Sequence, residues 1–435
     1  MQRLLDRMPA AWRETFESAR LAQTILVTAF TLVLANPLWR ALIGEAGYTA
    51  ALLALAVVAA FSVTARRSAI DFTNALPASL LLYLAWATAS LLWSYQPGET
   101  LWRLTNLLAT TALALFIAWA RDTIQIVRGL GNVLRLLLSA SLLVEVAVAW
   151  LHPTGLPLLH ISGRIFIGGP IQGLLGARGT LAFMALVALF TFAIEWRTRS
   201  VRPWLGASST ALALACLALA SSPISFVAAG IVAIAAGMLW VLRRSKPRVR
   251  WSLNVSFAFV GLVALLLIWT NRIQILTLLD GRGETTLRVH VWQEMSQYLL
   301  YRPLQGWGFS GGWWVGGPYQ WVQQATDKTL GSGMNAFIDV YFQLGVIGLV
   351  LFITLLGTAL VRTWVLASNR RSAIYLWPAL TAVTLAIVSF ADSFVLSGGG
   401  WLLLVVAAVK AARELTWADA LRTRSGAALP SRAGR

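Results

Sequence analysis

The chain contains twelve long, mostly apolar stretches, and this feature constrains its fold more than any other. The hydrocarbon core of a bilayer is about 30 Å thick, which a helix of roughly 20 residues crosses. Only 12% of the residues are charged, whereas a soluble domain carries about a quarter. We therefore predict an all-α integral membrane protein. The predicted spans are 22–43, 49–64, 76–93, 101–120, 126–150, 175–195, 204–221, 224–242, 251–269, 335–361, 374–394 and 397–413.

Basic residues gather in every second connection between these predicted spans. Lys and Arg close to a span resist translocation, so the basic loops are expected on the cytoplasmic side. An even number of spans then predicts that both termini are cytoplasmic as well. The basic connections contain Arg66 and Arg67, Arg121 and Arg128, Arg197, Arg199 and Arg202, Arg243 to Arg250, and Arg370 and Arg371.

The remaining composition excludes several classes of function. The net charge of +18 does not indicate a nucleic-acid partner, because the basic residues fall between apolar runs and not on one folded face. The single Cys216 has no partner for a disulfide. No His, Cys, Asp or Glu group has metal-ligand spacing, and no nucleotide-binding loop is present. We predict no metal and no cofactor, so an activated substrate must supply the energy for any bond formed.

The spans divide the chain into five parts. A long connection between packed spans is usually functional or disordered, and the five Trp within 270–333 argue against disorder. We therefore expect that connection to form a folded cap on the outer side. The predicted parts are an amphipathic cytoplasmic N-terminus over 1–20, spans 1–9 over 21–269, the cap over 270–334, spans 10–12 over 335–413, and a basic cytoplasmic tail over 414–435.

Within the cap, residues 285–301 are predicted to form a helix that Pro303 ends. Arg288, Trp292 and Met295 share one stripe of that helix, which places Arg288 over a partly apolar groove. The alternative is a surface salt bridge between Arg288 and Glu284, four residues earlier. The composition of the Trp-rich run 306–321 suits stacking against sugar rings, although an ordinary interfacial aromatic belt is the preferred explanation for any single Trp.

Three stretches carry a resemblance to a known family. The longest runs from LRVHVWQEMSQYLLYRPLQGWG through the cap to MNAFIDVYFQLGVIG at 334–348; the others are SLLWSYQPGETLWR at 90–103 and GLLGARGTLAF at 173–183. Their order and spacing resemble the bacterial O-antigen ligase and O-antigen/exopolysaccharide polymerase superfamily. The positions that fall on the family pattern are Arg288, Trp292, Pro303, Gly306, Gly308, Asn335, Gly345 and Gly348.

The resemblance implies a class C glycosyltransferase-like protein of the bacterial inner membrane. Its about twelve transmembrane helices would carry a helical periplasmic cap between spans 9 and 10. The family's outer Arg residues are thought to hold the diphosphate of an undecaprenyl-linked donor, which Arg can do bidentately at any relevant pH. The residues expected in that role are Arg178, Arg288 and Arg282, with Trp292, Asn335 and Arg164 supporting them.

Two positions depart from the family pattern. Met334 stands where the family usually has the His that assists the acceptor hydroxyl, and Gly179 stands where it usually has Asn. The candidates for the missing catalytic group are Asp339 and His290. Helical geometry puts Asp339 about 140° around its helix from Met334, and His290 about 200° around from Arg288.

The function that the resemblance implies is transfer of a glycan from undecaprenyl-diphosphate to a saccharide acceptor. A polysaccharide polymerase is preferred to an O-antigen ligase acting on lipid A-core, because FIDVYFQLGVIG resembles the exopolysaccharide polymerase version of the motif. The remaining alternatives are a catalytically impaired relative that binds the carrier and organises other polysaccharide-assembly proteins, and a transporter of lipid-linked sugars. A transporter would need ionisable groups or broken helices near the bilayer midplane.

Overall fold

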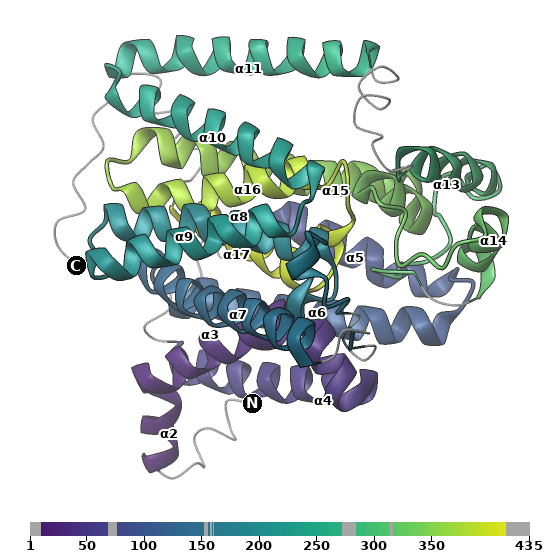
Figure 1. Ribbon diagram of the computed structural model, residues 1–435, viewed down its shortest axis with the longest axis horizontal. Coiled ribbons are helices and arrows are strands. Elements are labelled where there is room, and N and C mark those ends of the chain that lie inside the picture. Colours follow the sequence, from purple (N-terminus) through teal and green to yellow (C-terminus); the bar gives the residue numbers. More distant parts are fainter. Residues whose placement is uncertain are drawn as a thin grey trace.

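The computed structural model describes residues 10–67, 76–151, 155–156, 159, 161–271, 284–313 and 316–414. Over these residues the chain is helical apart from short connections and one isolated bridge between Leu156 and Ile161. Figure 1 shows the long helices side by side along the longest axis. The helices are α2 (Ala10–Glu17), α3 (Ala19–Leu34), α4 (Asn36–Ala65), α5 (Ala78–Ala89), α6 (Pro97–Ala120), α7 (Thr123–Leu151), α8 (Arg178–Arg197), α9 (Pro203–Leu219), α10 (Pro223–Arg244), α11 (Pro247–Thr270), α13 (Glu284–Leu299), α14 (Gly317–Thr326), α15 (Ala336–Asn369), α16 (Leu376–Val388) and α17 (Gly398–Glu414).

Each predicted span coincides with a helix or with parts of two. Among the described residues, six helices are long and apolar enough to cross a membrane, namely α4, α6, α7, α8, α10 and α15, and shorter apolar helices include α3, α5, α9 and α16. The prediction of an all-α protein with multiple membrane-type helices is confirmed. The count of twelve crossings and the five-part division remain predictions, and residues 1–9 and 415–435 of the two predicted terminal parts lie outside the described residues.

The first predicted span, 22–43, is divided between two helices. α3 ends at Leu34 and α4 begins at Asn36, because Pro37 lacks the backbone N–H that would continue the helix. α4 then bends at Gly44, whose φ of 73° lies in the left-handed region. A short helical piece therefore lies between these two breaks.

α15 contains a second break at Gly345, which has a φ of 67°. A Cβ atom at Gly345 would lie 2.1 Å from the carbonyl oxygen of Leu304, so only glycine lets the backbone of the connection after α13 approach this closely. The break also frees carbonyl groups that would otherwise bond within the helix. The carbonyls of Phe342, Gln343 and Leu344 accept hydrogen bonds from Trp307 N, Gly308 N and Trp86 Nε1 respectively. Gly345 thus allows the connection after α13 to pack directly against α15.

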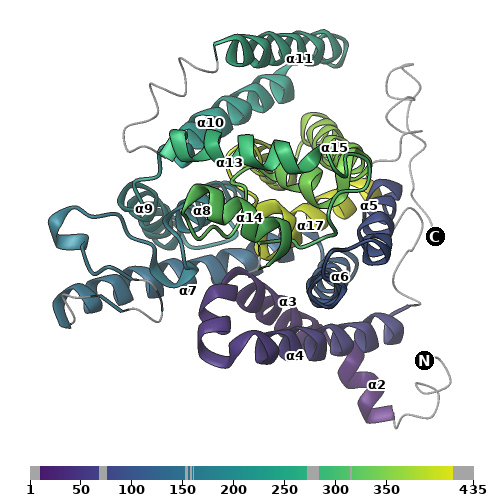
Figure 2. The ribbon, with the colours of Figure 1, turned by 90° about the vertical axis from the view of Figure 1, so that its right-hand side faces the viewer.

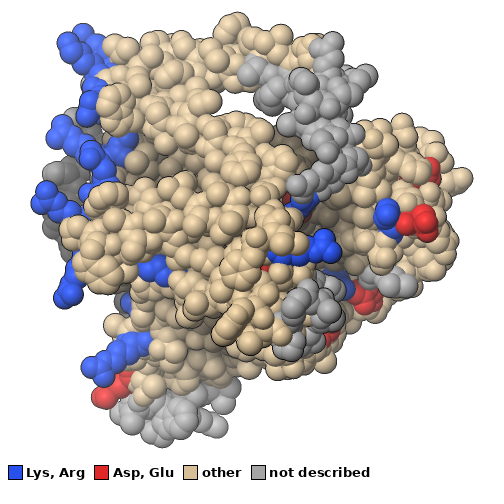
Figure 3. Space-filling view, viewed as in Figure 1, with Lys and Arg blue, Asp and Glu red and all other residues tan. Residues whose placement is uncertain are grey.

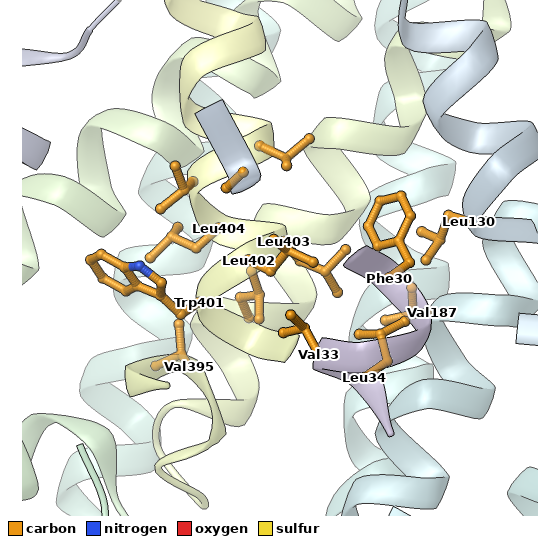
Figure 4. Packing of buried hydrophobic residues seen from close by; sticks show 14 of the residues in the cluster. Phe30, Val33, Leu34, Leu130, Val187, Val395, Trp401, Leu402, Leu403 and Leu404 are labelled. Atoms are coloured by element: carbon orange, nitrogen blue, oxygen red, sulfur yellow. The ribbon is translucent and has the colours of Figure 1, made fainter. Parts of the chain in front are cut away.

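The main hydrophobic core is centred on α17. This helix is buried along its length, and Figures 1 and 2 show it surrounded by other helices. Figure 4 shows Leu402 and Leu403 facing Val33 of α3, with Phe30 and Val187 close by. Its buried Trp401 donates to Thr111 Oγ1 at 2.8 Å, so the one polar atom of that indole ring is satisfied. A helix without a polar face requires such a central position.

A separate hydrophobic cluster forms around α13 and α14. The predicted helix over 285–301 is confirmed as α13, and it ends at Leu299 shortly before Pro303. We use the name cap for residues 284–334; α13 and α14 lie at the right-hand end of the bundle in Figure 1 and face the viewer in Figure 2. The buried residues of the cluster are Val291, Met295, Leu299, Trp307, Trp313, Tyr319, Val322 and Phe342. Several cap Trp side chains thus fill a core and do not form an exposed aromatic belt.

Lys and Arg side chains gather at the end of the molecule opposite α13 and α14 (Figure 3). α8 and α10 end there with basic residues in their last turns. The distribution agrees with the alternation seen in the sequence, and on the positive-inside rule it favours a cytoplasmic basic end.

We expect Cys introduced at Ser296, an exposed position on α13, to react with an impermeant thiol reagent in intact cells. Cys introduced at Ser245, at the basic end, should react only after permeabilisation. The native Cys216 is buried, so the unmodified protein provides a low background. Labelling of Ser245→Cys with protection of Ser296→Cys in intact cells would reverse the proposed orientation.

Candidate functional site

Arg288 connects the cap to the loop between α16 and α17. Its Nη1 atom donates to the carbonyl oxygen of Met334 at 2.9 Å and to that of Ala391 at 2.6 Å. These partners lie at the start of α15 and after the end of α16, so the side chain spans the junction of cap and bundle. The side chain of Glu284, the alternative partner expected from the sequence, lies outside the described side chains.

Three charged groups converge at this junction. α16 ends at Val388, so Asp392 lies in a connecting segment and not inside a helix. Burial lowers the pKa of Arg288, the nearby Asp392 carboxylate raises it, and the nearby Arg178 guanidinium lowers it further. The structure therefore brings Arg178 and Arg288 together, although 110 positions separate them in the sequence, and it adds an acidic residue to the pair.

The start of α8 provides the other wall of this site. Arg178 is the first residue of α8, and Ala177 before it has no side-chain cap. A Cβ atom added at Gly179 would lie 3.7 Å from Asp392 Oδ2. Because Gly179 has no side chain, the carboxylate lies next to the N-terminal turn of α8, whose partial positive charge favours anions. The Gly that stands in place of the family Asn thus leaves the first turn of α8 open toward Asp392.

Trp292 and Asn335 hold the segment on which Arg288 depends. Trp292 Nε1 donates to the carbonyl oxygen of Gly333 at 2.7 Å. Asn335 caps α15 by accepting from Phe337 N at 3.0 Å and donates to the carbonyl oxygen of Phe390 at 3.1 Å. The structure places both predicted supporting residues around the same two segments, 333–335 and 390–391.

Asp339 lies directly beneath this site and is completely buried. Its carboxylate accepts hydrogen bonds from Trp313 Nε1 at 2.7 Å, from Gly333 N at 2.8 Å and from Ser393 Oγ. These bonds connect the cap, the start of α15 and the α16–α17 loop. A carboxylate held by three protein donors and closed off from solvent holds the surrounding segments in place.

Met334 adopts a left-handed backbone conformation with a φ of 54°. Its side chain packs against the hydrophobic cluster of the cap, and its carbonyl oxygen receives Arg288. The position of the family His is therefore filled by an apolar side chain, while its backbone holds the arginine.

Two predicted site residues lie away from this cluster. His290 is exposed on α13, with Nε2 3.7 Å from Glu294 Oε1. Arg164 is exposed beside the short turn Ile165–Ile167. Among the described residues no contact joins either side chain to Arg288, and Arg282 lies outside the described residues.

The sequence interpretation missed Asp392 as a site residue. The predicted span 374–394 enclosed it, which made it an acidic residue near the end of a helix. The available signal was the sequence after it, SFVLSGGG, because Ser and Gly clusters favour a connection over a helix. The sequence already places Asp392 near the outer end of its span, and Arg178 and Arg288 on the same outer side, but it does not show that the three residues meet.

Residues 208–353 match a family model described as O-antigen ligase. The matched region contains the cap with Arg288 and Trp292, and it extends through the start of α15 with Asn335 and Asp339. Arg178 precedes it and Asp392 follows it. No curated protein matches the chain. The match supports membrane glycosyl transfer of the O-antigen ligase and polymerase type. The resemblance of this chain to that superfamily is thus confirmed over residues 208–353.

Proposed function

We propose that the protein transfers a glycan from an undecaprenyl-diphosphate carrier to a saccharide acceptor at the outer face of the bacterial inner membrane. The observation that carries this proposal is the convergence of Arg178, Arg288 and Asp392 where the cap meets the bundle. The match to the O-antigen ligase family over residues 208–353 supports the same reaction class.

The two arginines suit a lipid-linked diphosphate. Both described bonds of Arg288 use Nη1, so within the described part of the chain its Nε and Nη2 atoms have no protein acceptor. Those two nitrogens form the planar fork that binds phosphate oxygens bidentately. Arg178 and the N-terminal turn of α8 add positive potential beside it.

The same groups favour the transition state of the transfer. The acceptor hydroxyl oxygen attacks the anomeric carbon, the bond from that carbon to the diphosphate oxygen breaks, and the diphosphate leaves with the bonding electrons. Negative charge therefore grows on the diphosphate as the bond breaks, and fixed guanidinium groups stabilise that charge more in the transition state than in the substrate. Attack from the face opposite the leaving group inverts the anomeric centre.

Asp392 is the group best placed to accept the proton of the attacking hydroxyl. Burial raises the pKa of Asp392, while hydrogen bonds from the Ser393 and Phe394 backbone and the charge of Arg288 oppose that shift. A raised pKa makes a carboxylate a better proton acceptor near neutral pH. This assignment replaces Asp339 and His290 as our candidate for the missing family His.

We expect Asp392→Asn to lower the transfer rate by roughly a hundredfold, which lies within the usual contribution of a general base. In the unmodified protein the rate should fall as the pH drops through the pKa of Asp392, because only the ionised carboxylate accepts a proton. That fall should occur above the range of an ordinary Asp. An Asn variant with the same rate and the same acid limb would remove Asp392 from the mechanism.

The reaction is tested by incubating purified protein with undecaprenyl-diphosphate oligosaccharide, with and without a lipid A-core acceptor. We propose the polymerase reaction first, so longer lipid-linked chains should appear without lipid A-core. Glycan attached only to lipid A-core would identify a ligase. A boiled sample and Arg288→Ala serve as controls.

A second candidate is a carrier-binding relative that organises other polysaccharide-assembly proteins, and Met334 favours it because no imidazole occupies that position. It would bind the lipid-linked donor in the same assay and release no product. A transporter is less well supported. Arg135 is the ionisable residue of this chain expected to lie deepest in the bilayer. It pairs with Glu195, which lies two residues before the basic end of α8 and not at the middle of a span.

A further inference from the structure

A second cavity lies beside the proposed donor site, between the starts of α4 and α6. It has a volume of about 100 Å³ and is closed on its other sides by cap residues 309–312 and by the start of α17. The charged residues that line it are Arg40 of α4 and Arg103 of α6. The mechanism above uses neither residue.

The two arginines leave hydrogen-bond donors available to the cavity. Arg103 donates from Nε to Glu99 at 2.9 Å, which leaves its two terminal nitrogens without an acceptor among the described residues. Arg40 lies over the Tyr48 ring, with Nη1 3.3 Å from Glu45, and its Nη2 atom has no acceptor within the described part of the chain, whereas its Nε atom is closed off from solvent. Neither Glu99 nor Glu45 lines the cavity. The wall therefore presents guanidinium donors and not their carboxylate partners, which favours an anion.

The rest of the wall suits a sugar. Asn106 is fixed by bonds with Thr49 and with the Trp102 carbonyl, and Asn36 contributes a second amide group. Amide groups can bond hydroxyl groups, and an aromatic ring can cover the apolar face of a sugar ring. Gly311, with a φ of 63°, brings the backbone of the cap to this wall.

The cavity and the donor site share two structural segments. Gly398 lines the cavity and is the first residue of α17, six positions after Asp392, and a Cβ atom on it would lie 2.6 Å from Asn36 Nδ2. On the other side, a Cβ atom on Gly176, two residues before Arg178, would lie 2.7 Å from Cβ of Pro37. The first turn of α4 thus lies between the two sites and contacts both.

We propose that this cavity binds an anionic group, a carboxylate or a phosphate, on the saccharide acceptor. The inference rests on the proposed glycan transfer, which requires an acceptor site next to the diphosphate site. The guanidinium groups of Arg40 and Arg103 would hold the oxyanion, and the amide and aromatic wall would hold the ring that carries it.

The test measures binding to the full-length protein in lipid nanodiscs without any lipid-linked donor, so it does not depend on glycan transfer. The probes are glucuronate, glucose 6-phosphate, glucose and inorganic phosphate. The acidic sugars should bind at least about tenfold more tightly than glucose, as expected when charged hydrogen bonds are gained. Arg103→Gln should remove that difference, and Arg40→Gln should do so independently. Lys246→Gln, at the basic end, is the matched control.

Equal binding of glucuronate and glucose would overturn the proposal, as would unchanged binding in both arginine variants. Inorganic phosphate that binds as tightly as glucose 6-phosphate would show that the cavity does not recognise a saccharide. The preference for glucuronate over glucose should be unchanged in Arg288→Lys, which alters only the diphosphate site. If transfer is also observed, Arg103→Gln should raise KM for an acidic acceptor while KM for the donor stays constant. Absence of transfer together with selective probe binding would reject the proposed function and retain the cavity as an acidic-sugar site.

Discussion

Replacing Arg288 by Lys is expected to lower the rate of glycan transfer by roughly a hundredfold, the effect typical of losing one transition-state donor. The lysine keeps a positive charge but removes the planar fork formed by Nε and Nη2. The two carbonyl partners of Arg288, on Met334 and Ala391, remain within reach of an ammonium group. The variant should therefore stay folded while it loses bidentate contact with the diphosphate.

The measurement is product formation from undecaprenyl-diphosphate oligosaccharide, compared with the thermal unfolding of the same preparations. Arg178→Ala should also lower the rate, because the two arginines approach one anion. Lys246→Gln controls for loss of a positive charge far from the site. Full activity in both Arg178→Ala and Arg288→Ala would reject a shared diphosphate site.

Replacing Asp339 by Ala is expected to destabilise the junction of cap and bundle by at least about 3 kcal/mol. The carboxylate is completely buried, and its removal leaves Trp313 Nε1, Gly333 N and Ser393 Oγ without an acceptor. Each buried donor that loses its partner costs about 1–3 kcal/mol. The readouts are the unfolding temperature of the purified protein and the rate of proteolysis within the cap.

Asp339→Asn separates a positioning role from a catalytic one. The amide keeps one acceptor oxygen, so its unfolding temperature should lie between those of the unmodified protein and Asp339→Ala. Its transfer activity should fall in proportion to the loss of folded protein. A fully stable Asp339→Asn variant with no activity would instead make Asp339 the catalytic carboxylate. His290→Gln, on the exposed side of α13, should leave both readouts unchanged.

The glycine pattern shows how far a sequence motif can be interpreted without a structure. The spacing of Gly306, Gly308 and Gly345 formed part of the family resemblance. The spacing did not reveal its physical reason, which is the close approach of two backbones. A Cβ atom on Gly306 would lie 2.5 Å from the carbonyl oxygen of Gln343, and one on Gly345 would lie 2.1 Å from that of Leu304.

Local sequence patterns were enough to predict the all-α membrane class, most of the apolar helices and the helix that carries Arg288. These features depend on local hydropathy and on helix breakers such as Pro303, which act over a few neighbouring residues. The break at Ala35 was missed although Asn36 and Pro37 follow it, and the early end of α16 at Val388 was missed because Phe390 and Ala391 extend the apolar run.

Which polar residues share a site depends on the tertiary packing. Arg178, Arg288 and Asp392 come from three distant segments, and Arg40 and Arg103 from two others. Their meeting depends on how the helices pack around α17 and on where the cap settles against α15. Hydropathy patterns indicate which residues are apolar, but they contain no information about the partner that each helix face contacts. For the same reason the sequence suggested Asp339 and His290 as the missing catalytic group, whereas in the fold Asp339 is buried and His290 is exposed.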